Sequence, residues 1–82
     1  MNDTEIIYRF IKVSIPDNHP AIYQYIEGGS RSQISAVNNI LKVADVLTPP
    51  YTVGHIKTVI RRFLKEKQEQ HRNGEIYIKP IY

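Results

Sequence analysis

Residues that break regular structure divide this chain into short segments, and this division limits what it can fold into. The breaks are Pro16, Gly28-Gly29, Thr48-Pro49-Pro50 and Asn73-Gly74. Each segment between them is long enough for one helix or one strand, so the 82 residues predict one small domain. A core of this size gives limited stability, and the absence of cysteine excludes disulfides, thiol nucleophiles and cysteine-ligated zinc. We therefore expect oligomerisation, as a homodimer, to supply the missing stability.

The first segment alternates between two kinds of side chain over residues 8–15. One side of this alternation consists of Ile11, Val13 and Ile15, and the other consists of Phe10, Lys12 and Ser14. The alternation and the β-branched residues predict a strand that Pro16 ends. A helix over residues 4–15 stays open as the alternative, because Ile7, Phe10, Ile11 and Ser14 also lie at helical spacing.

The middle of the chain predicts two helices separated by Gly28-Gly29. Asp17 is the expected cap of the first, with Pro20 in its first turn, and Ser30 or Ser32 is the expected cap of the second. The buried face of the first consists of Ile22, Tyr25 and Ile26. The apolar stripe of the second consists of Ile34, Val37, Leu41, Ala44 and Leu47. The glycine pair is expected to end the first helix in a left-handed conformation.

A third amphipathic helix is expected from a cap at Thr52 to about residue 70. Its apolar face consists of Val53, Ile56, Ile60, Phe63 and Leu64. Lys57, Arg61 and Lys65 follow one another at four-residue spacing on its other side. Asn73-Gly74 predicts a tight turn, and residues 75–82 predict an extended tail.

The net charge of +3 is unevenly distributed along the chain. Residues 1–54 carry four basic and five acidic residues, whereas residues 55–82 carry seven basic and three acidic residues. This concentration of positive charge near the C-terminus predicts a polyanion or an acidic partner for that part of the chain.

The order of these elements resembles the ribbon-helix-helix family of DNA-binding proteins. The resemblance covers residues 8–47 and rests on Ile11-Lys12-Val13-Ser14-Ile15-Pro16 and on Gly29-Ser30-Arg31-Ser32-Gln33-Ile34-Ser35, each followed by a predicted helix. It implies a homodimer whose paired strands form a β-ribbon in the major groove, within a mainly α fold. Residues 1–48 would form this unit, and residues 49–82 would add the basic third helix and the tail to the same compact domain.

The resemblance also implies two sets of DNA contacts. The base-reading set consists of Phe10, Lys12 and Ser14. The phosphate-binding set at the start of the second helix consists of Ser30, Arg31, Ser32 and Gln33, where free N–H groups and the helix dipole favour an anion. The basic stripe of Lys57, Arg61 and Lys65 is expected to bind further phosphates.

Within this family, the added helix and tail resemble ParR-type adaptors of plasmid partition systems. The resemblance implies that the protein binds double-stranded centromere DNA, where homodimers would assemble further on repeated sites, and that it joins this DNA to an actin-like filament. The expected filament contacts are Tyr77, Ile78, Ile81 and Tyr82. An autorepressor is the other role that the family implies.

Two other interpretations stay open. A winged helix-turn-helix protein of a plasmid or phage would place the basic helix in the DNA groove, with a wing at Asn73-Gly74. A protein-interaction adaptor without DNA binding would use the six tyrosines.

Catalysis is not expected, because His19, His55 and His71 lie on different segments without metal-ligand spacing. No metal or cofactor site is predicted. The N-terminus lacks the layout of a signal peptide, and no stretch is long and apolar enough to span a membrane. A cytoplasmic location is therefore expected.

Overall fold

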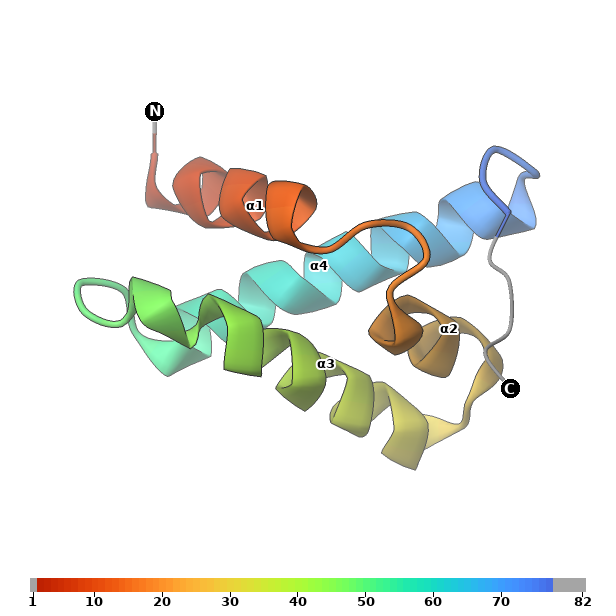
Figure 1. Ribbon diagram of the computed structural model, residues 1–82, viewed down its shortest axis with the longest axis horizontal. Helices are drawn as coiled ribbons and strands as arrows, with labels where there is room; N and C mark the ends of the chain where they lie inside the picture. Colours follow the sequence, from red (N-terminus) through yellow and green to blue (C-terminus); the bar gives the residue numbers. More distant parts are fainter. Residues whose placement is uncertain (1, 78–82) are drawn as a thin grey trace.

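The computed structural model describes residues 2–77, and these residues form four α-helices and no strand. In chain order the elements are α1 (Asp3–Ser14), α2 (Pro20–Glu27), α3 (Ser30–Ala44), the short 3-10 helix η1 (Asp45–Leu47) and α4 (Val53–Arg72). The longest helix, α4, packs against each of the other three, and α3 runs alongside it in the opposite direction (Figure 1). The predicted β-ribbon is therefore wrong for the described residues. The winged-helix alternative is wrong for the same reason, since it also needs a sheet.

The start of α1 is stabilised by local interactions that the strand prediction did not use. The Asn2 side chain accepts a hydrogen bond from the backbone N–H of Glu5 at 2.8 Å and caps the helix. Asp3 and Glu5 place negative charge in the first turn, where it interacts favourably with the positive end of the helix dipole. At the other end, Ile15 is extended, as the residue before a proline prefers to be, so Pro16 ends a helix rather than a strand.

Burial in α1 follows the helical period. Ile7 and Ile11 are fully buried and Ile15 is 2% exposed, so three residues at four-residue spacing face the core. Val13 is 86% exposed, although the predicted strand placed it beside Ile11 and Ile15. Tyr8 packs edge-on against Phe63 of α4, with ring centroids 6.2 Å apart. The buried residues of this segment therefore lie on one face of a helix, and not on one side of a strand.

The caps of α2 and α3 differ from the predicted ones. His19, rather than Asp17, caps α2, and Asp17 instead forms an ion pair with Lys67 of α4, with 2.8 Å between Oδ1 and Nζ. The N-cap of α3 is Gly29, so Ser30 is already the first helical residue and neither predicted serine caps this helix.

The glycine between α2 and α3 has a steric explanation. The backbone of Gly28 is extended, with φ −90°, so a left-handed conformation is not what requires glycine here. A Cβ at this position would lie 2.2 Å from the Ser32 Cβ and 2.6 Å from the Gln24 carbonyl oxygen. A side chain on Gly28 would therefore push the two helices apart.

Protonation of His19 is expected to weaken the start of α2. Its Nδ1 accepts a hydrogen bond from the backbone N–H of Ala21 at 3.1 Å, which only an unprotonated nitrogen can do. Burial lowers the pKa of His19 below its ordinary value of 6.5. Because the folded state has the lower pKa, the stabilisation is complete above the unfolded pKa and is lost as the pH falls through the folded pKa. The expected loss is about 1 kcal/mol at most, the usual size of a cap contribution.

Denaturant unfolding on both sides of pH 6.5 checks this expectation, with His19→Asn as the control variant. Asparagine keeps a capping side chain but does not titrate in this range, so its stability should vary less with pH. Equal pH dependence in the two proteins would show that His19 does not cause it.

The apolar face of α3 is rotated from the predicted stripe. Its buried residues are Ala36, Val37, Ile40 and Ala44, whereas Ile34 is 63% exposed. Val37 and Ala44 were predicted correctly, and Ile34 was not. In α4, the cap at Thr52 is confirmed, because its side chain accepts a hydrogen bond from the N–H of His55 at 3.2 Å.

The turn after α4 is also confirmed. Gly74 has a φ of 75°, a left-handed conformation that glycine adopts without strain. Among the predicted filament contacts, Tyr77 is 80% exposed, and Ile78, Ile81 and Tyr82 lie outside the described residues. Because α1 satisfies its own backbone hydrogen bonds, the need for strand exchange no longer supports a homodimer. None of the described helices combines the length and the apolar character needed to cross a membrane.

Candidate functional site

Basic and acidic residues are unevenly distributed among the four helices. The helices α3 and α4 together carry eight basic and two acidic residues, whereas α1 and α2 carry two basic and three acidic residues. The positive charge that the sequence showed near the C-terminus lies on α4, and the neighbouring helix α3 adds two more basic residues and no acidic one. A site for an anion is best sought between them.

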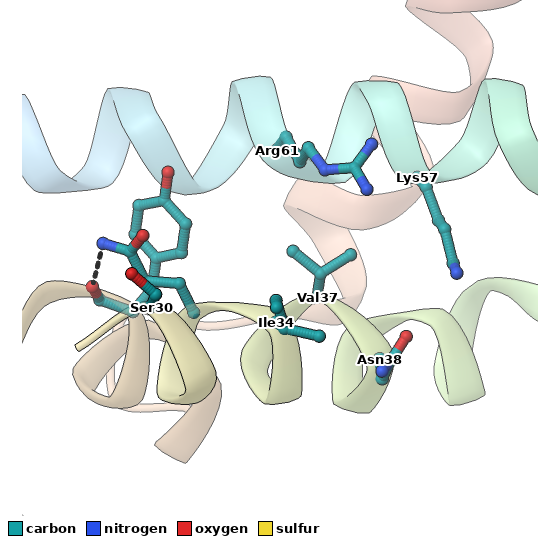
Figure 2. Close-up of a pocket in the computed structure, with 8 residues that line it drawn as sticks. Ser30, Ile34, Val37, Asn38, Lys57 and Arg61 are labelled. Carbon is teal, nitrogen blue, oxygen red and sulfur yellow. Dashed lines mark hydrogen bonds between the residues drawn. The ribbon is translucent and has the colours of Figure 1, made fainter. Parts of the chain in front are cut away.

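A groove with a volume of about 310 Å³ lies between α3 and α4. Figure 2 shows the two helices side by side, with side chains of each directed into the space between them. The residues that line the groove are Tyr25, Ser30, Gln33, Ile34, Val37, Asn38, Lys57 and Arg61. The groove thus combines an apolar part with two cations and several hydrogen-bonding groups.

Lys57 and Arg61 supply the positive charge of the groove. They lie one helical turn apart on α4, and both extend from α4 over the groove in Figure 2. Residues 2–77 contain two ion pairs, Arg62–Glu66 and Lys67–Asp17, and neither includes Lys57 or Arg61. Like charges at this spacing repel each other by a few tenths of a kcal/mol, a cost that a bound anion would remove.

Two other basic residues near the centre of α4, Arg62 and Lys67, make contacts with side chains outside the groove. Glu66 accepts hydrogen bonds from the Tyr8 hydroxyl of α1 and from Arg62 Nε, the latter at 3.0 Å. The hydrogen bond to Glu66, together with burial, raises the pKa of Tyr8. Lys67 lies 5.5 Å from the centroid of the Phe63 ring, in addition to its ion pair with Asp17. Arg62 and Lys67 thus have carboxylate partners within residues 2–77, whereas Lys57 and Arg61 have none there and are free to contact a ligand.

Some polar side chains of the groove already make hydrogen bonds within the protein, and others do not. Gln33 Nε2 donates to the backbone carbonyl of Tyr25 at 3.3 Å, the dashed line in Figure 2. Asn38 is exposed, and its amide makes no hydrogen bond with any residue of the described chain. Ile34 lies one turn before Asn38 and is exposed in spite of its apolar side chain. The groove therefore offers free donors and acceptors beside an apolar surface.

The fold brings together two sets of residues that the sequence placed in separate phosphate sites. Ser30 and Gln33, from the start of α3, line the same groove as Lys57 and Arg61 of α4. Three predicted phosphate contacts lie outside this groove: Arg31 is exposed, Ser32 adjoins Gly28, and Lys65 lines a second hollow on α4.

The predicted base-reading residues lie on α1 and not on a ribbon. Phe10 packs against the core, Lys12 is exposed, and Ser14 is half-buried, so they do not share an outward face. The β-ribbon that would have presented them to DNA is absent from residues 2–77. Three groove residues, Tyr25, Val37 and Asn38, were not predicted from the sequence as part of a site, and Ile34 was assigned to the core.

Two of the three histidines make contacts that belong to the fold. His19 caps α2, and the Thr4 hydroxyl lies 3.0 Å from His55 Nε2, joining the starts of α1 and α4. Over residues 2–77 there is no cluster of three acidic or histidine side chains able to hold a metal ion.

Comparisons with family models, curated proteins and solved structures were made for the whole chain. No family model, no curated protein and no solved structure matches it. The resemblance to ribbon-helix-helix proteins therefore has no support from relatives, and the groove between α3 and α4 is the feature on which a function can be argued.

Proposed function

We propose that this protein binds double-stranded DNA through the surface formed by α3 and α4. The observation that carries the proposal is the pair of cations, Lys57 and Arg61, which have no carboxylate partner within residues 2–77 and lie across the groove from α3. Phosphate contacts from such cations supply most of the affinity of proteins for DNA.

The outward face of α3 suits insertion into a DNA groove. Its exposed residues recur at helical spacing along one side: Arg31, Ile34, Ser35, Asn38 and Lys42. The major groove is wide enough to admit an α-helix, and these side chains are mostly of the types that contact bases and phosphates.

The connection between α2 and α3 supports the same assignment. A short helix, a glycine link and a longer helix follow one another, and α2 packs closely on α3. In helix-turn-helix units with this order, the second helix enters the major groove while neighbouring elements contact the backbone. With α3 in the major groove, Lys57 and Arg61 of α4 would lie beside it, close to the phosphates at the edge of the groove.

Salt dependence tests this proposal. The full chain is titrated into a fluorescently labelled duplex of mixed sequence at several salt concentrations, and binding is followed by anisotropy. We expect the logarithm of the association constant to fall linearly with the logarithm of salt, with a slope of about −2 or steeper. Absence of binding at low salt, or affinity independent of salt, would contradict the proposal and favour a protein-interaction adaptor.

The narrower roles stay predictions. A partition adaptor and an autorepressor both need duplex binding, and they differ in the partner that the tail contacts. Most of that tail lies outside the described residues. The homodimer likewise stays a prediction, which sedimentation of the full chain with and without DNA would test.

A further inference from the structure

Two neighbouring asparagines on α3 have different surroundings. Asn39 is half-buried, and its Nδ2 donates to Gln24 Oε1 of α2 at 2.9 Å. Asn38 is exposed, lines the groove and makes no hydrogen bond with residues 2–77. The carboxamide of Asn38 therefore offers one donor group and one acceptor to a ligand, whereas that of Asn39 is already used.

An exposed isoleucine lies next to Asn38 on the same side of the helix. Ile34 precedes it by four residues, which places the two side chains one above the other. Ile34 is 63% exposed and stands between polar residues on the outward face of α3. Burying this exposed apolar side chain against an apolar group of a ligand would add to the binding free energy. A ligand that fits both side chains presents such a group beside a hydrogen-bonding edge.

An A·T base pair presents both groups in the major groove. Adenine has the N7 acceptor and the N6 donor, which match a carboxamide, and thymine has a methyl group, which matches an apolar side chain. A G·C pair offers no methyl group, and its guanine edge has acceptors only. Building on the proposed DNA binding, we infer that α3 selects A·T base pairs, with Asn38 bonded to adenine and Ile34 against a thymine methyl.

Base analogues test each contact separately. A preferred site is first selected from random duplexes with the full chain. In that site, adenines are replaced singly by 7-deazaadenine, which lacks N7, and thymines by uracil, which lacks the methyl group. We expect one deaza substitution to weaken binding at least about fivefold. One uracil substitution should weaken it about fourfold, the value of one buried methyl group.

Variants then assign each contact to a side chain. Asn38→Ala should bind the parent site more weakly and lose its response to the deaza substitution, while it keeps its response to uracil. Ile34→Ala should show the opposite pattern. The matched control is Asn39→Ala, which should keep both responses because Asn39 is bonded to α2. Circular dichroism of each variant establishes that it is folded.

The outcomes separate this inference from the proposed function. Salt-dependent duplex binding without A·T selection, or with equal responses in Asn38→Ala and the wild type, overturns base reading and leaves DNA binding in place. No duplex binding at low salt overturns both.

Discussion

Replacing Ile11 by alanine is expected to lower the free energy of unfolding by about 3 kcal/mol, the usual cost of deleting a fully buried isoleucine side chain. Ile11 is 0% exposed and lies at the centre of the buried face of α1. Val13→Ala, two residues away, should change the free energy of unfolding by no more than about 0.5 kcal/mol, because Val13 is 86% exposed. Alanine is also the better helix former, which offsets part of any loss.

This pair of variants distinguishes a helix from a strand. In the predicted strand, Ile11 and Val13 share the buried side and would lose similar amounts of stability. Urea unfolding followed by circular dichroism gives both values. Comparable losses in the two variants would contradict α1 as described.

Replacing Lys57 and Arg61 together by alanine is expected to weaken duplex DNA binding about 100-fold at 0.1 M salt. Each phosphate contact contributes about one unit to the salt slope, which corresponds to about tenfold in affinity at this concentration. The salt slope should therefore also fall by about two units, and the loss should be similar for every sequence. Anisotropy titrations over a range of salt measure the affinity and the slope together.

The control for this variant removes the same charge from α1, outside the groove. Arg9 and Lys12 are both exposed on α1, so Arg9→Ala with Lys12→Ala changes the net charge equally without touching the groove. Its affinity and salt slope should stay close to those of the wild type. Equal losses in both double variants would show that binding follows net charge and not the groove.

The helices after Pro16 could be predicted because their breaks and apolar spacing agree. The glycine pair, the two prolines and the cap at Thr52 all occur where the structure begins or ends a helix. The first segment could not be decided by pattern, since Ile11 and Ile15 satisfy a period of two and a helical period of four alike. A capping signal was present at Asn2 and Glu5, where an N-cap asparagine is followed by glutamate three residues later.

The components of the site were visible in the sequence, but their proximity was not. The start of α3 and the middle of α4 are far apart in the chain, and only the antiparallel packing of the two helices joins Ser30 and Gln33 to Lys57 and Arg61. Ile34 was assigned to the core because residues at its spacing from Val37 and Leu41 share a broad helical face. The core uses Ile40 in its place, which only the packing of α3 on its neighbours decides. Asn38 follows no apolar or charged pattern, so periodicity could not single it out.

The separation of charge between the two helix pairs has a consequence for kinetics. A body that is basic along α3 and α4 and slightly acidic along α1 and α2 carries an electric dipole. The field of a polyanion orients such a dipole before contact, so that α3 and α4 face the polyanion in most encounters. Productive association is then faster than for an even distribution of the same net charge, and added salt removes this advantage.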